Sequence, residues 1–330
     1  MDHMSLAAEM PLPEVPAEMH WSENYCFDGY DPKTGVGFWL HLGRWHRNAD
    51  LWREEVFLYL PDGTFCVHRA IGRRKESGGA FGPTLSLLCE KAGETWRMRF
   101  QGPARRTTPE ELAGGELKDA PLDYLELDVV FDATSAVWDF GESVKDEVWA
   151  SSHYEQTGSL RGTVTFAGET IAMDTHGFRD HSRGPRVQKS IAGHCWIHGQ
   201  FPDGTGFALF DLRMRQGKEL VQGVAMAAVF ADNRTFKATY SSLPYLTSIH
   251  NPPSSYAIRI ESERGTMNLE ARVLRSLPLT VDSLNDSYYG VSVIAGVSTL
   301  VAWEQPTEFT WNGRIGIGHT ERTCNIGETR

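Results

Sequence analysis

Apolar and polar side chains alternate in short runs along most of this chain. In the segment 122–134, Leu125, Leu127 and Val129 are separated by polar or charged residues, which places the apolar side chains on one face of a strand. Comparable runs rich in Val, Ile, Phe, Tyr, Trp and Thr recur before and after residue 187. They cover residues 36–44, 54–71, 95–102, 158–174, 191–215, 219–243, 254–276, 288–306 and 308–321. The pattern predicts a chain built mainly of β-strands.

Tight-turn residues interrupt these runs at regular spacing. Asp62-Gly63 and Asp203-Gly204 each lie in the middle of a run, and Asp-Gly readily adopts the positive φ angles of a hairpin turn. Further turns are expected at 167–168, 232–233 and 264–265. One short helix is expected at 108–117, where Thr108 can cap and Pro109 fits the first helical position. Hairpins at this spacing are typical of β-sandwiches and β-barrels.

About eight strands are expected on each side of the segment 175–190, a number that suits two closed antiparallel barrels. We therefore predict a flexible tail at residues 1–17, one barrel at 18–186 and a second at 187–330. The chain shows no strand–helix alternation and no glycine-rich phosphate-binding motif, so nucleotide-binding folds are not expected. Each barrel would be large enough to hold one small ligand.

Composition narrows the possible partners. The chain of 330 residues carries a net charge of −11, which argues against nucleic acids and anionic membranes as partners. Neither a signal peptide nor a membrane span is expected, because no window has the required apolar length. The five cysteines are scattered, without a paired motif, so we expect reduced thiols in a cytoplasmic protein. A homodimer is compatible with this composition.

The candidate chemistry concentrates around the sequence THGFRDHSRGPR at residues 175–186. This segment holds two histidines, one aspartate and three arginines between glycines. We predict catalytic roles for four residues, namely Asp180, His181, Trp196 and His198. We predict substrate contacts for six more, namely Tyr154, Glu155, His176, Arg179, His194 and Asp211.

Alternation predicts that His194, Trp196 and His198 share one face of their strand. Such a face lines a pocket or meets water, and Asp211 is expected to reach it from the paired strand. Two structural alternatives remain open. The Arg-Asp-His run could form a salt-bridge network within a turn, and histidines at 176, 181, 194 and 198 could converge on a metal. No ligand spacing selects a metal, so none is predicted.

Two longer stretches resemble a known superfamily. The segment HYEQ (153–156) followed by GTVTFAGETIAMDTHGFRDHSRGPR (162–186), and CWIHGQFPDGTGFALFD (195–211), are similar to the two-domain lipocalin-like proteins. That superfamily includes carotenoid 1,2-hydratases (hydroxyneurosporene synthases), AttH-like proteins, and related terpene cyclases and Diels–Alderases. Residues near the start, among them Trp21, Glu23, Gly29 and Arg44, resemble a bacterial branch of it. The resemblance implies an all-β chain of two tandem lipocalin-like antiparallel β-barrels with few short helices, and an active site near their junction.

The resemblance also implies a reaction. Asp180 matches the aspartate thought to protonate a C=C bond in the hydratases, and Trp196 matches a neighbouring aromatic residue. A protonated Asp180 would act as an acid, with Trp196 and Tyr154 stabilising a carbocation and His181 or His198 holding water. Alternatively, Arg179 would hold Asp180 as a carboxylate, which would then act as a base or orient His181.

We therefore expect a cofactor-independent hydratase/lyase, or a cyclase/isomerase, that acts on an apolar terpenoid- or steroid-like substrate. The alternative is a non-catalytic carrier for a hydrophobic small molecule, in which Arg179 and Asp180 form a structural clamp.

Overall fold

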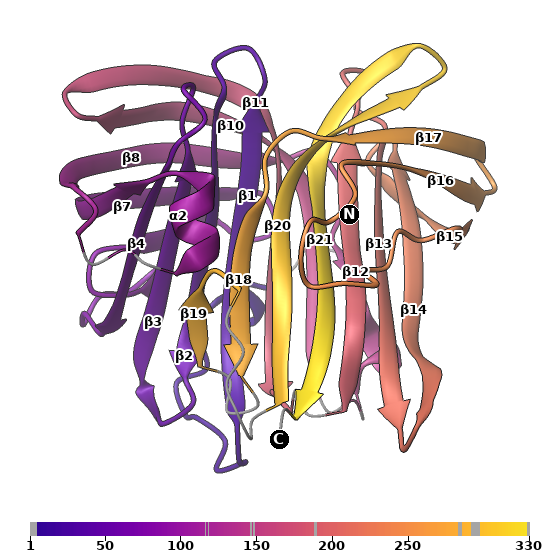
Figure 1. Ribbon diagram of the computed structural model, residues 1–330, viewed down its shortest axis with the longest axis horizontal. Helices are drawn as coiled ribbons and strands as arrows, with labels where there is room; N and C mark the ends of the chain where they lie inside the picture. Colours follow the sequence, from indigo (N-terminus) through magenta and orange to yellow (C-terminus); the bar gives the residue numbers. More distant parts are fainter. Residues whose placement is uncertain are drawn as a thin grey trace. The chain divides into compact units, whose positions relative to one another are not determined.

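The computed structural model describes residues 5–115, 117, 119–145, 147, 149–187, 190–282, 286–291 and 298–328. The chain divides into two compact units. The first comprises Met1–Thr108 with Leu117–Arg186, and the second comprises Pro109–Glu116 with Val187–Arg330. Each unit is built around one antiparallel sheet (Figure 1). The predicted all-β fold with few short helices is confirmed.

The first sheet runs in the order β4-β3-β2-β1-β11-β10-β8-β7-β6-β5, with β9 paired to β10. A further pairing between β4 and β7 closes eight of these strands into a barrel. The strands are β1 (Trp21–Asp31), β2 (Val36–Trp45), β3 (Asn48–Tyr59), β4 (Phe65–Gly72), β5 (Gly79–Phe81), β6 (Ser86–Lys91), β7 (Thr95–Thr107), β8 (Leu122–Ala133), β9 (Trp138–Asp139), β10 (Ser152–Phe166) and β11 (Glu169–Pro185).

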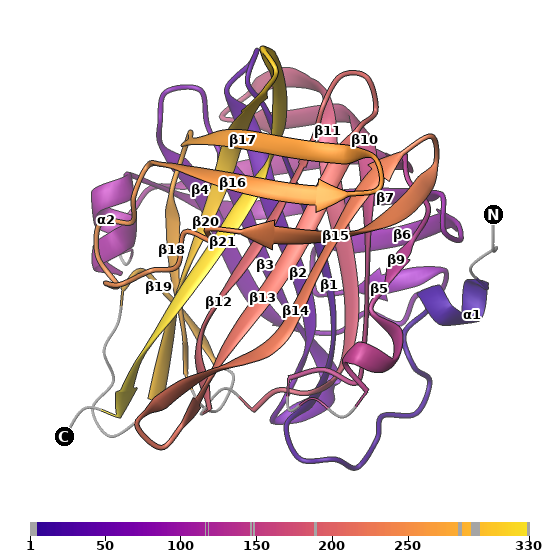
Figure 2. The same cartoon turned by 90° about the vertical axis from the view of Figure 1, so that its right-hand side faces the viewer.

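The second sheet runs in the order β17-β16-β15-β14-β13-β12-β21-β20-β18-β19, and a pairing between β17 and β20 closes it in the same way. Figure 2 shows β15, β16 and β17 running across the long strands β12, β13 and β14. The strands are β12 (Ile191–Gln200), β13 (Gly206–Gln216), β14 (Glu219–Ala231), β15 (Arg234–Ser241), β16 (Ser255–Ser262), β17 (Gly265–Val273), β18 (Leu277–Asp282), β19 (Ser287–Tyr289), β20 (Ser298–Trp311) and β21 (Arg314–Glu328).

The two closed barrels have equivalent connectivity. In each, successive strands of the barrel are neighbours and the first strand pairs with the last, β1 with β11 and β12 with β21. Counting around each barrel makes β7 equivalent to β16, β10 to β20 and β11 to β21. The first barrel carries β5, β6 and β9 as additions, and the second carries β18 and β19.

Helical structure is limited to α1 (Leu6–Glu9), α2 (Pro109–Gly114) and the 3₁₀ turn η1 (Gly141–Ser143) among the described residues. The helix α2 belongs to the second unit and lies beside β18 and β19. The expectation of a flexible tail at residues 1–17 is wrong for α1. The Ser5 side chain caps this helix by accepting from the Ala8 amide, and Glu9 at its end is completely buried. No helix in the described ranges has the length and apolarity to cross a membrane.

Each barrel has its own apolar interior. In the first, Tyr25 and Phe27 of β1 point inward and pack on Trp96 of β7. In the second, Cys195 and Ile197 of β12 belong to the interior cluster. Side chains alternate along a strand, so the residue between Tyr25 and Phe27 and the residue between Cys195 and Ile197 point the other way. They lie on the outer face, which is the face of the sheet that points away from the barrel interior.

Candidate functional site

Strands β1, β10 and β11 lie side by side in the first barrel and carry most of the predicted site residues. On β11, His181 lies between Tyr25 of β1 and Tyr154 of β10, and the positions of these three residues face the interior. The next residue toward the N-terminus, Asp180, lies between Cys26 and Glu155. Asp180 and Glu155 therefore occupy the outer face.

This register divides the predicted residues of the first unit into two groups. Tyr154, Arg179 and His181 face the interior, whereas Glu155 and Asp180 face outward. The alternative in which Arg179 holds Asp180 as a carboxylate is wrong, because consecutive strand residues point to opposite faces. The same alternation prevents Asp180 and His181 from acting together on one face.

Arg179 pairs instead with Glu9 of α1. Its Nη1 and Nη2 atoms donate to the Glu9 carboxylate at 3.0 and 2.8 Å, and its Nε and Nη2 atoms donate to Gln156 Oε1 at 3.0 and 2.8 Å. Both charged side chains are buried, with Arg179 1% and Glu9 0% exposed. Burial by itself lowers the pKa of Arg179, but the Glu9 carboxylate raises it above its usual value. The guanidinium also lies over the Trp96 ring, at 5.5 Å from its centroid.

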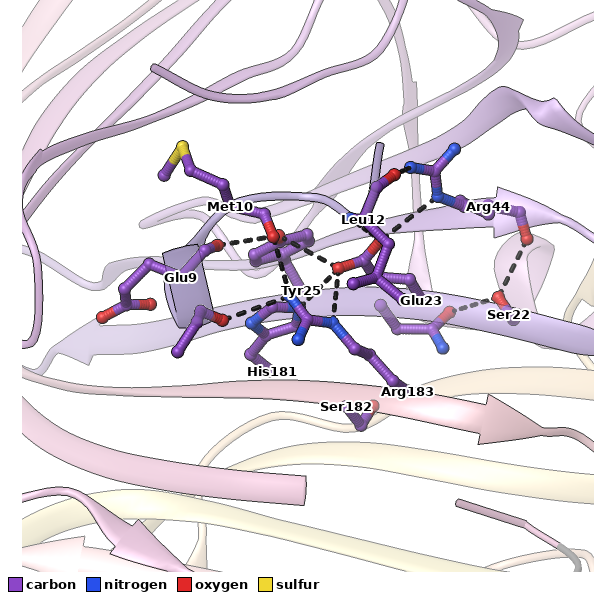
Figure 3. A network of polar contacts seen from close by, with 12 residues as sticks. Glu9, Met10, Leu12, Ser22, Glu23, Tyr25, Arg44, His181, Ser182 and Arg183 are labelled. Carbon is purple, nitrogen blue, oxygen red and sulfur yellow. Dashed lines mark hydrogen bonds and ion pairs between the residues drawn. The ribbon is translucent and has the colours of Figure 1, made fainter. Parts of the chain in front are cut away.

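Glu23 of β1 is the centre of the adjoining cluster (Figure 3). Its carboxylate accepts from Arg183 Nε at 2.7 Å, Arg44 Nε at 3.2 Å and the Leu12 amide at 3.0 Å, and it lies 3.0 Å from His181 Nε2. Burial raises the pKa of Glu23, but His181 and Arg183 outweigh burial and hold it at about 2. Glu23 is therefore ionised at neutral pH.

Tyr154 joins the two clusters. Its hydroxyl donates to Glu9 at 2.6 Å and lies 2.7 Å from His181 Nδ1. Burial lowers the pKa of His181 to about 4, although the Glu23 carboxylate beside it opposes this shift, so its ring is neutral at pH 7. The Tyr25 ring stacks on His181 with the centroids 3.9 Å apart.

The N-terminal segment is held by its backbone as well as by Glu9. Arg183 Nη2 donates to the carbonyls of Ala8 and Met10 at 3.1 and 2.7 Å, and Arg44 Nη2 donates to that of Leu12 at 2.6 Å (Figure 3). The partners of Arg179, Arg183 and Arg44 thus come from the chain itself. This interior network, defined as Glu9, Glu23, Tyr154, Gln156, Arg179, His181 and Arg183, is a structural lock for the segment 5–12.

The outer face presents a different set of groups. Glu155 is completely buried and lies 2.9 Å from His153 Nε2, and the pKa of His153 is lowered to about 4 by burial, against an opposing effect of the Asp180 charge. Arg186 donates from Nη2 to Ser182 Oγ at 2.7 Å, and burial lowers its pKa to about 10 despite the nearby Asp180. Asp180 thus lies near His153 and Arg186, with Glu155 directly opposite it on β10.

His176 lies on β11 opposite Ser159. Its pKa is lowered by burial, and the charge that partly opposes this shift is that of Asp174. Among the described residues, no three His, Cys, Asp or Glu side chains are arranged to hold a metal ion.

In the second unit, Trp196 and His198 lie on the outer face of β12. Their ring centroids are 5.2 Å apart, and His198 stacks on His319 of β21 at 5.9 Å. His319 Nε2 in turn lies 2.8 Å from Glu304 Oε2 on β20. These rings and the carboxylate are buried. His194, also on β12, contacts Glu321 through its Nε2 atom.

Asp211 does not lie on this face. It pairs with Cys195, whose side chain points into the second barrel, and it accepts hydrogen bonds from the hydroxyls of Tyr240 and Tyr245. The expectation that Asp211 reaches His194, Trp196 and His198 is therefore wrong. The strand register, which the sequence pattern does not specify, decides the face.

Several polar residues of these groups lie outside the predicted set. They are Glu9, Glu23, His153, Gln156, Arg183, Glu304 and His319. His153 and Gln156 flank Tyr154 and Glu155 in the segment HYEQ, so the prediction for those two residues already pointed to this part of the chain. Glu9 had none, because it is separated from Arg179 by 170 residues.

These features define a protein of two closed antiparallel β-barrels, with a buried polar lock inside the first and carboxyl and histidine groups on the outer faces. The chain belongs to the family described as Domain of unknown function (DUF7064), which matches residues 7–326.

Solved structures share this fold. An AttH-like protein from Nitrosomonas europaea is 18% identical, with 97% of this chain and 100% of that chain covered and a TM-score of 0.59. CghA solved with Sch210972 is 9% identical, with 94% and 90% covered and a TM-score of 0.56. A second structure of CghA is 10% identical, with 98% and 97% covered and a TM-score of 0.54. At these identities the likeness concerns the fold. A search of curated proteins found no match.

Proposed function

We propose that this protein is a cofactor-independent enzyme that transfers a proton at a C=C bond of an apolar, terpenoid- or steroid-like molecule, with Asp180 as the catalytic residue. The observation that carries the proposal is the direct pairing of Asp180 with Glu155 on one outer face, with Arg179 turned away to Glu9. The similarity in fold to CghA, solved with Sch210972, is compatible with a barrel of this kind handling a small molecule.

The paired carboxyl groups suit acid–base chemistry. Residues directly opposite on antiparallel strands have Cβ atoms about 5 Å apart, and two ionised carboxylates at that spacing repel each other. Sharing one proton removes the repulsion and leaves one acid beside one base. His153, neutral at pH 7, can donate its Nε2 hydrogen to Glu155 and thereby favours the ionised form of Glu155. In this assignment the shared proton resides on Asp180, against the opposing effect of the nearby Arg186 cation.

This assignment makes Asp180 the acid and Glu155 the group that favours its protonation. In a hydration, the Asp180 proton would pass to one alkene carbon, water would add to the carbocation at the other, and the water would return a proton to Asp180. Dehydration is the reverse. In an isomerisation or cyclisation, a carbon-bound proton would be lost in place of water addition.

For Trp196 and His198 we propose the roles that the sequence predicted. Trp196 would offer a π face to a cationic intermediate, and His198, stacked on His319, would hold water. The variants Trp196→Leu and His198→Gln in the assay below test these roles one at a time, since each role requires a loss of turnover.

The test uses heavy water, because the substrate need not be known beforehand. The protein is incubated in D₂O with a panel of neutral terpenoid alkenes and steroid enones, and products are examined by mass spectrometry for deuterium at carbon. We expect one deuteron per turnover with the wild type and none with Asp180→Asn. Asp174→Asn is the matched control, since Asp174 is an exposed aspartate on the same strand.

Deuterium incorporation that survives in Asp180→Asn would contradict the assignment of Asp180. A wild type that binds a compound of the panel tightly but never exchanges deuterium would favour the carrier alternative. In a carrier, Asp180→Asn would change stability and leave the bound compound chemically unchanged.

A further inference from the structure

The second barrel contains a buried arginine in its interior. Arg322 of β21 pairs with Cys195 of β12, a residue of the interior cluster, and is 0% exposed. Its Nε and Nη2 atoms donate to Gln305 Oε1 on β20 at 2.9 and 2.5 Å, and Nη2 also donates to the Pro253 carbonyl at 2.8 Å. The guanidinium lies 5.4 Å from the centroid of the Tyr256 ring on β16.

These contacts repeat those of Arg179 in the first barrel. Each arginine lies on the last strand, donates from Nε and Nη2 to a glutamine on the preceding barrel strand, and lies over an aromatic ring, Trp96 on β7 or Tyr256 on β16. These strands are equivalent in the two barrels. The repeat therefore includes the interior polar groups as well as the strand order.

One partner of the repeat is missing in the second barrel. Arg179 is bound by the Glu9 carboxylate, whereas Arg322 has no ion pair with any described residue, and its buried Nη1 atom has no hydrogen-bond partner. Burial lowers the pKa of Arg322, although the Tyr256 and Cys195 side chains oppose that effect. A buried guanidinium without a counterion is costly, so the site favours an anion.

We infer that the interior of the second barrel binds the carboxylate of a small apolar acid at Arg322, through the free Nη1 atom of the guanidinium. The Nη2 atom already donates to Gln305 and to the Pro253 carbonyl, so the Nη1 atom is the donor that remains for a carboxylate oxygen.

The surroundings of Arg322 indicate the rest of the ligand. The interior cluster around Cys195 consists of aliphatic and aromatic side chains, and three half-buried tyrosines border it at positions 240, 245 and 256. This lining suits an apolar tail. Asp211, already held by two tyrosine hydroxyls, adds a negative charge near Cys195 and thus disfavours ligands with several carboxylates. A monocarboxylic acid fits best.

The experiment compares decanoate with methyl decanoate, which has the same chain without the charge. Calorimetric titration of the wild type should show binding of decanoate and not of the ester. Arg322→Gln should weaken decanoate binding by about tenfold or more, the effect of losing a charged hydrogen bond. Arg314→Gln, which alters a half-exposed arginine on the same strand, should bind decanoate like the wild type.

A second measurement covers the case in which Arg322→Gln does not fold. In wild-type protein, the ¹³C resonance of carboxyl-labelled decanoate should show that the bound acid stays ionised at a lower pH than the free acid, because a guanidinium favours the carboxylate. Equal binding of acid and ester, undiminished binding by Arg322→Gln, an unshifted titration of the bound acid, or no binding of decanoate would each overturn the inference. The site is independent of the proposed chemistry at Asp180.

Discussion

Arg179 and Arg322 lie on the equivalent last strands of two barrels of the same connectivity, yet they have different partners. Both are buried, both are held by a glutamine, and both lie over an aromatic ring. In the first barrel the guanidinium also binds Glu9, and its pKa is raised above the usual value. In the second barrel no carboxylate of the described residues binds it, and its pKa is lowered.

The difference shows that the same arrangement of an arginine, a glutamine and an aromatic ring can have two different roles. The repeated arginine and glutamine form a carboxylate receptor in each barrel, and in the first barrel the receptor is filled by the chain's own segment 5–12. Arg183 and Arg44 hold the backbone of that segment, so its docking depends on several contacts. The first receptor is thereby structural, and the second remains free for a ligand.

The largest expected effect comes from removing the carboxylate that fills the first receptor. Glu9→Ala leaves Arg179 buried without its ion pair, and breaking a buried pair from one side costs about 3–5 kcal/mol of the free energy of unfolding. Denaturant unfolding followed by tryptophan fluorescence measures this loss. Glu14→Ala, which alters an exposed glutamate two residues beyond that segment, should change the free energy by less than about 0.5 kcal/mol. Equal effects of the two variants would show that the lock does not stabilise the barrel.

Lowering the pH should have the next largest effect, and it should affect the stability of the two barrels differently. The pKa of His181 is lowered to about 4 by burial, so its stabilising effect is lost as the pH falls from about 6.5 toward 4, where the unfolded chain binds a proton that the folded chain refuses. The pKa of Glu23 is about 2, so its contribution, on the order of 3 kcal/mol, is lost as the pH falls from about 4.5 toward 2. His153 acts in the same window as His181.

Hydrogen exchange, measured on peptides from each barrel, reports this loss of stability for each barrel separately. Protection of β1 and β11 should begin to fall below about pH 6.5 in the wild type, and His181→Gln should remove part of that first phase. The neighbours of Arg322 should not contribute to this loss of protection, because Gln305 does not titrate and burial raises the pKa of Tyr256. If the loss of protection below about pH 6.5 is as large in His181→Gln as in the wild type, groups other than His181 cause it.

The fold followed from the sequence because strand formation is a local property. Alternation such as that of Leu125, Leu127 and Val129, together with turns such as Asp62-Gly63, predicted antiparallel strands, and the all-β double barrel was observed. The face of each residue relative to its neighbours on one strand was also predictable, as Trp196 and His198 show. The pairing of one strand with the next was not, and Asp211 was assigned to the wrong face for that reason.

The candidate site was only partly accessible from the sequence. Sequence proximity suggested Arg179 as the partner of Asp180, but alternation separates them, and the true partner of Arg179 lies in a segment with no strand pattern of its own. Pairing across such a distance depends on the closed tertiary structure. Neither composition nor spacing carries that information.

The smallest expected effect tests the comparison most directly. Glu9→Ala converts the first receptor into an empty one, like that at Arg322, so a free carboxylate should occupy it. If acetate binds with a Kd of about 10 mM, then 100 mM acetate should restore about 1.4 kcal/mol of the free energy of unfolding. The measurement is denaturant unfolding in sodium acetate, with sodium chloride at equal ionic strength as the control. The double variant Glu9→Ala/Arg179→Met should gain nothing from acetate, because the guanidinium is gone. If both variants gain equally, acetate acts as a general stabiliser, and the view of Arg179 as a carboxylate receptor fails.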